Sequence, residues 1–469
     1  MFQVWLEEHK KLKGLHANAI RPDQRSKQSG ETSTLDPIVG PALLMGSVLI
    51  AFATQKRGQG GPLEWSLWVL AGALAIPVVA PLGLTYTSVT AGIIVVVGII
   101  SLASPTLFSL IPKGALRAEP VNQGRRSVGL AKLVFLSAVM LMLVAVGFQA
   151  FKSDIASATG LSFDQLSPTE IRAAQTSNAR GGGILALMGS AGPILACLGL
   201  YGALRFSRWW YLLSAVSVWV ALQSPARLTV VSLILVMAVF YLYARRSMSE
   251  GPTQKKLRKR TVFLIVGGAG GGALAIFNLI GAQLGKNQSA TALFPHFTWP
   301  QWSLNPLLYF GGGFPALSQA LDLRVNPFDA GGSFFSVMKV ANVFFPDIQV
   351  PDTIGRYVGI PIQFNLYTGF GQVYFDVGLI GVIGAFVLLG WLSGLAHRWA
   401  MEGRLEWAFA SAVLATVLLS LPQSYILFHL DLIFQLVIGF WVFWAIRYER
   451  RLRGVLEPAR RKNHRFSSR

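Results

Sequence analysis

The sequence predicts an all-α membrane protein, a polytopic bundle of about eleven transmembrane helices (10 to 12) with one long, partly helical exported loop. Hydrophobic residues make up 53% of the 469-residue chain and charged residues 13%, about half the charged fraction usual in soluble domains. The apolar residues also come in runs of about 18 to 25, the length at which a helix crosses a bilayer with its backbone hydrogen bonds satisfied internally.

The apolar runs define the predicted elements in order along the chain. A polar tail (1–36) comes first, the bundle occupies 37–447, and a basic tail (448–469) comes last. Spans are expected at residues 37–54, 65–81, 86–111, 128–150, 183–203, 209–224, 226–244, 261–283, 369–395, 405–427 and 430–447. The connection at 284–368 is far longer than a simple turn, and loops of this length are usually functional.

The net charge of +20 is distributed as a membrane protein requires. Basic residues are concentrated in alternate connections, which is the pattern of the positive-inside rule and argues against a nucleic-acid partner. The basic C-terminal tail is therefore expected in the cytoplasm, and the segments 151–182 and 284–368 on the exported face. The N-terminal tail is also basic, yet an eleven-span count places it outside, so its side of the membrane is left open.

Glycines mark two further features of the chain. In the long loop, Gly311–Gly313 followed by Phe314 and Pro315 predicts a turn into a short helix, because proline suits a first helical turn. The run Gly267–Gly272 resembles a phosphate-binding loop but lies inside an apolar span with no strand before it. We expect it to allow close packing against a neighbouring helix.

The apolar stretch Phe334–Phe345 predicts a helix that lies at the membrane interface or re-enters the membrane.

Polar side chains gather where the loop 284–368 leads into the next span. Asn365, Tyr367, Tyr374 and Asp376 lie there, and an ionisable group at the mouth of an apolar helix is a functional candidate. Asp376 is the first candidate for a general base, with His429 as another, since both can accept a proton. Helix capping is the alternative for the turn that carries His429.

Arginines at the exported ends of the spans are candidates for binding a diphosphate. Arg227 begins the apolar run 226–244, where its planar guanidinium could donate several hydrogen bonds to phosphate oxygens or simply reach the interface. Four further arginines in the exported segments are candidates of the same kind, with solvated surface charges as the alternative: Arg172, Arg180, Arg324 and Arg356. No metal-ligand spacing is found, so neither a protein-held metal nor a cofactor is expected.

Three stretches of the chain resemble the O-antigen polymerase family, the Wzy-type oligosaccharide repeat unit polymerases. They are Leu222–Thr229, Tyr309–Leu317 and Asn365–Gly381. The resemblance implies a glycosyltransferase of the bacterial plasma (inner) membrane that joins polyprenyl-diphosphate-linked repeat units into a polysaccharide on the outer face. Its partners would be a lipid-linked oligosaccharide donor and acceptor and membrane lipids, with a chain-length regulator left open.

The resemblance also implies roles for the candidate residues. Arg227 would neutralise the diphosphate together with other exported arginines, and Asp376 would take the acceptor proton. An O-antigen ligase, which passes finished glycan to another acceptor, is the nearest alternative. It is disfavoured because Phe364 rather than a histidine precedes Asn365. A flippase for lipid-linked oligosaccharide is the alternative from another class, although several charges along the spans or paired halves would then be expected.

Overall fold

The described part of the chain is an all-α bundle, as predicted. The computed structural model describes residues 36–57, 61–80, 82–84, 88–108, 110, 129–177, 184–224, 227–248, 259–284, 294, 297–323, 332–345, 347–348, 358–360 and 363–446. Among these residues the only strands are β1 (Val358–Gly359) and β2 (Gln363–Phe364), which pair antiparallel. The N-terminal tail up to residue 35 and the basic tail from residue 447 lie outside the described residues.

Each predicted apolar run contains a helix. These helices are α2 (Asp36–Arg57), α3 (Pro62–Val79), α4 (Val89–Leu107), α5 (Leu130–Thr159), α8 (Gly192–Arg205), α9 (Tyr211–Leu222), α10 (Arg227–Met248), α11 (Lys259–Gln283), α16 (Thr368–Met401), α17 (Leu405–Ser420) and a C-terminal helix (Leu430–Ile446). Within the described residues, five helices are long and apolar enough to cross a membrane: α3, α4, α5, α10 and α16. The chain is therefore a membrane protein by composition and helix length, but eleven crossings are not confirmed, because α8, α9 and α17 have only 14, 12 and 16 residues.

Short helical elements connect the long helices. They are η2 (Phe163–Gln165), α6 (Pro168–Ser177), α7 (Ile184–Leu187), η3 (Met188–Ala191), η4 (Arg208–Trp210), α13 (Gln301–Gly311), α14 (Gly313–Asp322), η5 (Gly332–Phe334) and α15 (Phe335–Phe344). The predicted turn at Gly311–Gly313 is confirmed, since α13 ends at Gly311 and α14 begins at Gly313. The predicted helix at Phe334–Phe345 is confirmed as α15.

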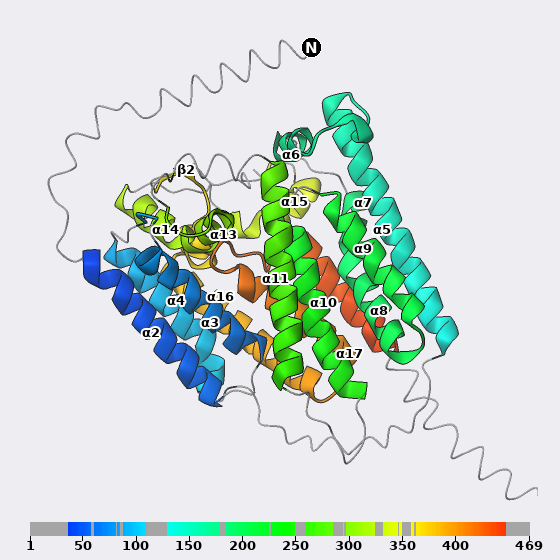
Figure 1. The fold of residues 1–469 in the computed structure, drawn as a ribbon, viewed down its shortest axis with the longest axis horizontal. Helices are drawn as coiled ribbons and strands as arrows, with labels where there is room; N and C mark the ends of the chain where they lie inside the picture. Colours follow the sequence, from blue (N-terminus) through cyan, green and yellow to red (C-terminus); the bar gives the residue numbers. More distant parts are fainter. Residues whose placement is uncertain are drawn as a thin grey trace, which may run out of the picture.

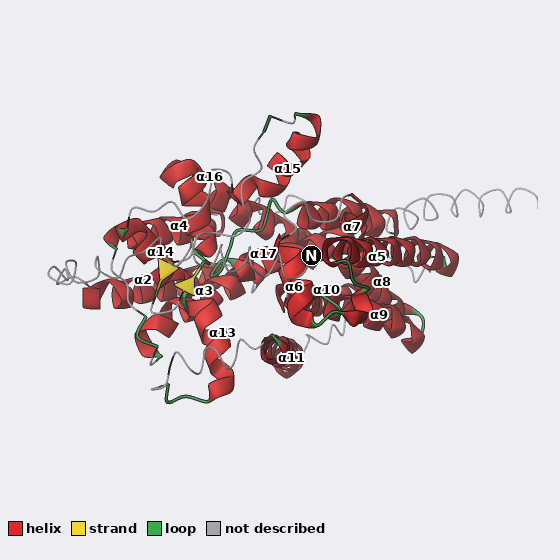
Figure 2. Cartoon of the chain, turned by 90° about the horizontal axis from the view of Figure 1, so that it is seen from above, coloured by secondary structure: helices red, strands yellow, loops and turns green. Residues whose placement is uncertain are grey.

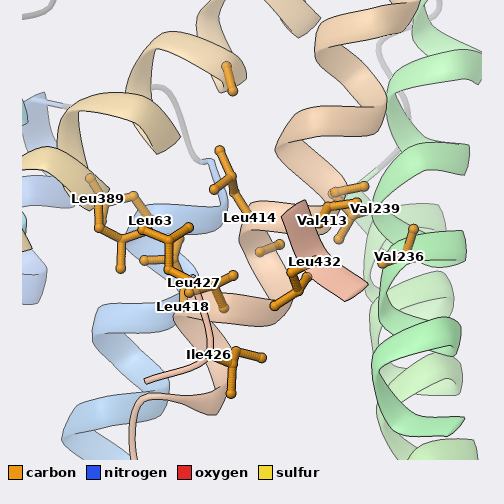
Figure 3. Packing of buried hydrophobic residues seen from close by; sticks show 14 of the residues in the cluster. Leu63, Val236, Val239, Leu389, Val413, Leu414, Leu418, Ile426, Leu427 and Leu432 are labelled. Carbon is orange, nitrogen blue, oxygen red and sulfur yellow. The ribbon is translucent and has the colours of Figure 1, made fainter. Parts of the chain in front are cut away.

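Helix α17 forms the centre of the bundle. Nearly all of its side chains are buried, as expected for a helix that is apolar on every side. Figure 3 shows Val413 of α17 beside Val236 and Val239 of α10, while Leu414 and Leu418 extend toward Leu63 of α3. The three longer helices α3, α10 and α16 therefore surround a short central one.

Helices α4 and α16 approach closely through glycines. A Cβ atom placed on Gly390 of α16 would lie 2.1 Å from the carbonyl oxygen of Leu102 in α4. A Cβ on Gly98 of α4 would meet the ring of Phe370. The small residues thus let the two backbones pack directly, as is common between membrane helices. This contact fixes α16, which carries most of the candidate site.

The glycine run in α11 does not pack in this way, so that prediction was wrong. Cβ atoms placed on Gly267, Gly268, Gly270, Gly271 and Gly272 would have no other atom within 4 Å. The space beside them is open because α11 lies at the edge of the bundle, where α10 and α13 are its main neighbours (Figure 2).

The short elements gather at one end of the bundle. Figure 1 shows α6, α13, α14, α15 and β2 together at the upper end, where α2 also begins. The described parts of the two segments predicted on the exported face, 151–182 and 284–368, thus share one end of the molecule. Four described arginines lie at the opposite end: Arg245 and Arg246 in the last turn of α10, Arg398 in the last turn of α16, and Arg404 directly before α17.

Candidate functional site

Helix α16 is interrupted directly after the predicted polar residues. Gly378 has φ 69° and ψ −170°, a backbone conformation that is essentially restricted to glycine. The stretch from 379 to 401 is about 35 Å long at 1.5 Å per residue, enough to cross the hydrocarbon core. The stretch Thr368–Val377 is therefore a separate helical segment at the head of the span. Interrupted helices at membrane depth occur where backbone groups are held by protein or line a site.

A second backbone feature marks the start of this segment. Thr368 is the only non-glycine with a positive φ among the described residues, at 63°, and it is fully buried. This conformation is strained for a β-branched residue, and such strain concentrates at functional sites. The Thr368 Oγ1 accepts a hydrogen bond from the amide of Gly371 at 3.0 Å, which stabilises the first turn.

The loop after α17 holds the head of α16 in place. The Gly369 amide donates to the Leu421 carbonyl at 2.8 Å, and the Tyr425 amide donates to Oε1 of the buried Gln372 at 2.9 Å. Gly313 of α14 lies against the Pro422 carbonyl, where a Cβ would approach to 2.3 Å. Segments far apart in the sequence thus meet around α16.

Asp376 binds the backbone of the long loop. Its Oδ2 accepts a hydrogen bond from the Ser333 amide in η5 at 2.6 Å, and its side chain is half-buried. A hydrogen bond to an ionised carboxylate is worth about 1.5–3 kcal/mol. Asp376 stands out in the sequence, whereas Ser333 does not. The only available signal was the pair Gly331 and Gly332, which precedes this serine in the long loop.

Aromatic stacking brings the turn that carries His429 to the same place. Phe334, next to Ser333, stacks on Phe428 with ring centroids 5.1 Å apart and an interplanar angle of 27°. Residues 333 and 334 thus lie between Asp376 on one side and the 428–429 turn on the other. Burial lowers the pKa of His429, and Asp431 opposes this shift. A mostly neutral imidazole can accept a proton near neutral pH.

The other predicted residues of this segment differ in how accessible they are. Tyr367 is buried, with 1% of its surface exposed, and its ring lies edge-on to Phe375 at 6.5 Å. Its ring is therefore part of the packed core in this structure. Asn365 and Tyr374 are half-buried, and Tyr374 contacts Phe375 at 5.8 Å.

The predicted arginines are only partly described. Arg227 is the first residue of α10. The last turns of α10 and α16 lie side by side, because Tyr243 of α10 contacts His397 of α16. Arg227 therefore lies at the same end of the bundle as the head of α16. Arg172 lies in α6, which packs on α5. Arg180, Arg324 and Arg356 lie outside the described residues.

Helix α15 carries an exposed apolar face beside the site. Val337, Val340 and Phe344 are 46%, 40% and 73% exposed, and they lie within about 60° of one another at 3.6 residues per turn. In the view along the bundle, α15 projects beyond the helices on the α16 side (Figure 2). On α16, Ile380 is 85% exposed just after the interruption at Gly378. Exposed apolar side chains thus lie both on α15 and at the start of the membrane part of α16.

A second polar cluster lies at the opposite end of the bundle and was missed by sequence reasoning. The Tyr243 hydroxyl is 2.5 Å from His397 Nδ1. The Ser411 hydroxyl donates a hydrogen bond to the Tyr243 hydroxyl at 3.2 Å. These contacts join α10, α16 and α17. Gly61 packs on the His397 ring, where a Cβ would approach to 2.7 Å, so a side chain at position 61 would have no room beside the ring.

Comparison with known protein families, characterised proteins and solved structures finds no match to this chain.

Proposed function

We propose that the chain is a membrane glycosyltransferase that polymerises polyprenyl-diphosphate-linked oligosaccharide repeat units. The observation that carries this proposal is the interrupted head of α16. There a carboxylate, Asp376, and an imidazole, His429, are held on either side of one loop, at the end of a membrane-spanning helix. A proton acceptor at this depth meets the requirement for activating a sugar hydroxyl close to the membrane surface.

In the proposed reaction, the hydroxyl oxygen of the acceptor sugar attacks the anomeric carbon of the donor glycan. The new carbon–oxygen bond forms as the bond from the anomeric carbon to the diphosphate oxygen breaks. Asp376 takes the proton of the attacking hydroxyl, and polyprenyl diphosphate leaves with the bonding electron pair. Arg227 and the other exported arginines would stabilise the negative charge on the diphosphate oxygens, as preorganised cations do in a transition state.

The position of α15 is consistent with a lipid-linked substrate. A short helix with one exposed apolar face is expected to lie in the membrane interface. The loop that binds Asp376 immediately precedes this helix, so the candidate base would lie near the level of the lipid head groups. The diphosphate of a polyprenyl-linked glycan would occupy the same level.

The experiment that tests this proposal is deletion of the gene followed by measurement of the lipid-linked glycans. Accumulation of single repeat units on the outer face of the membrane is expected for a lost polymerase. Full-length polymer that remains on its lipid would instead indicate a ligase. Repeat units confined to the inner face would indicate a flippase. Either of these two results would overturn the proposal.

A further inference from the structure

Two buried hydroxyl groups at the head of α16 have no hydrogen-bond partner in the described structure. They are Ser333 Oγ and the Tyr425 hydroxyl, and each residue is only 1% exposed. An unsatisfied buried hydroxyl costs about 1–3 kcal/mol, so such groups are rare and usually have an explanation.

Ser333 lies next to the candidate base, and Tyr425 is linked to the same place through an aromatic stack. The amide of Ser333 is the group that binds Asp376, so the Ser333 hydroxyl is attached to the residue in direct contact with that carboxylate. Tyr425 contacts the ring of Phe428 at 5.8 Å, and Phe428 stacks on Phe334. The two hydroxyls therefore belong to residues on the two sides of one aromatic stack.

The chemistry of these groups indicates a neutral, hydroxyl-rich ligand. A carboxylate repels phosphate, whereas carboxylates and hydroxyls exchange hydrogen bonds readily with sugar hydroxyls. Aromatic rings beside them offer the apolar surface that a sugar face requires. The Tyr425 hydroxyl can donate one hydrogen bond and accept others.

We propose that Ser333 and Tyr425 bind the acceptor sugar through their hydroxyl groups and orient it toward Asp376. This inference rests on the proposed function and assigns the acceptor sugar to a binding site. The acceptor sugar occupies the head of α16, and the donor diphosphate binds elsewhere among the exported cations. Both residues are positioned by contacts that do not involve their hydroxyls, so they are preorganised for a ligand.

The test compares variants that lack only the hydroxyl, Ser333→Ala and Tyr425→Phe, with matched controls. Ser137 and Ser393 also carry buried hydroxyls without a described partner, and they lie in α5 and in the membrane part of α16. Binding is measured by thermal-shift titration of the purified protein with two probes. One is lipid-linked oligosaccharide extracted from host membranes, and the other is polyprenyl diphosphate without sugar.

We expect Ser333→Ala and Tyr425→Phe to weaken binding of the lipid-linked oligosaccharide about three- to tenfold, as loss of a hydrogen bond would. Binding of bare polyprenyl diphosphate should not change, and the unliganded melting temperature should stay equal or rise. The alanine variants at the control serines should bind both probes normally.

Three results would overturn the inference: unchanged binding of both probes, equal weakening for both probes, or no binding of the oligosaccharide by the wild-type protein. Failure of the proposed function is distinguishable from these. A wild-type protein that binds the oligosaccharide through both hydroxyls but forms no polymer would refute the polymerase and leave the sugar site intact.

Discussion

Two substitutions of Asp376 separate its hydrogen bond to the Ser333 amide in η5 from its proposed role as a general base. Asp376→Asn keeps an oxygen that can accept the Ser333 amide hydrogen bond but removes the proton acceptor, whereas Asp376→Ala removes both. A bond to an ionised group contributes about 1.5–3 kcal/mol and a bond between neutral groups about 0.5–1.5 kcal/mol. Asp376→Asn should therefore lower the free energy of unfolding by about 1 kcal/mol, and Asp376→Ala by about 1.5–3 kcal/mol.

The effect on activity should be far larger and nearly the same in both variants. Loss of a general base reduces the rate about 10²- to 10⁴-fold. The assay is complementation of a deletion strain, with polysaccharide length read on a gel and protein level measured in the same membranes. Both variants should be present and form no polymer. Wild-type chain lengths from Asp376→Asn would refute the assignment of Asp376 as the base and leave it a structural ligand of Ser333.

Further predictions concern the backbone, the pH dependence and the membrane interface. Gly378→Ala should destabilise the purified protein by about 1–3 kcal/mol because its φ is 69°, whereas Gly384→Ala, at a site in the same helix with open space, should not. The lowered pKa of His429 means that the unfolded chain binds more protons, so stability should be lost as pH falls below about 6.5. The melting temperature of His429→Gln should depend less on pH in this range, and an unchanged dependence would remove His429 as its cause. A spin label at Phe344→Cys should be as accessible to oxygen in liposomes as one at Ile380→Cys, since the single native cysteine is buried. Accessibility to a water-soluble nickel complex instead would place α15 in water.

The sequence predicts the positions of the long helices well, because apolar runs of that length have few alternatives to helix. Helix ends and crossings are less predictable. The described part of the predicted span at 183–203 is divided into α7, η3 and α8, and Gly147 of α5 lies against the Gly189 backbone in η3. Such a contact between two glycines is set by tertiary packing and leaves no mark in hydropathy.

The candidate site is predictable only where polarity conflicts with an apolar surrounding. Asp376 stands out for that reason, and so does Arg227. Ser333 and Tyr425 do not stand out, because serine and tyrosine are ordinary in loops and near membranes. Their importance depends on burial and on contacts across the chain. The glycines of α11 are the opposite case. They are conspicuous in the sequence, but no neighbouring helix packs against them.

Reconstitution of the purified protein in liposomes with lipid-linked repeat units tests the central claim most directly. The measurement is the number of glycosidic linkages formed and the amount of polyprenyl diphosphate released. The account predicts a ladder of products, with one polyprenyl diphosphate released for each linkage formed and none with Asp376→Asn. Repeat units that remain single, with no polyprenyl diphosphate released, would contradict it.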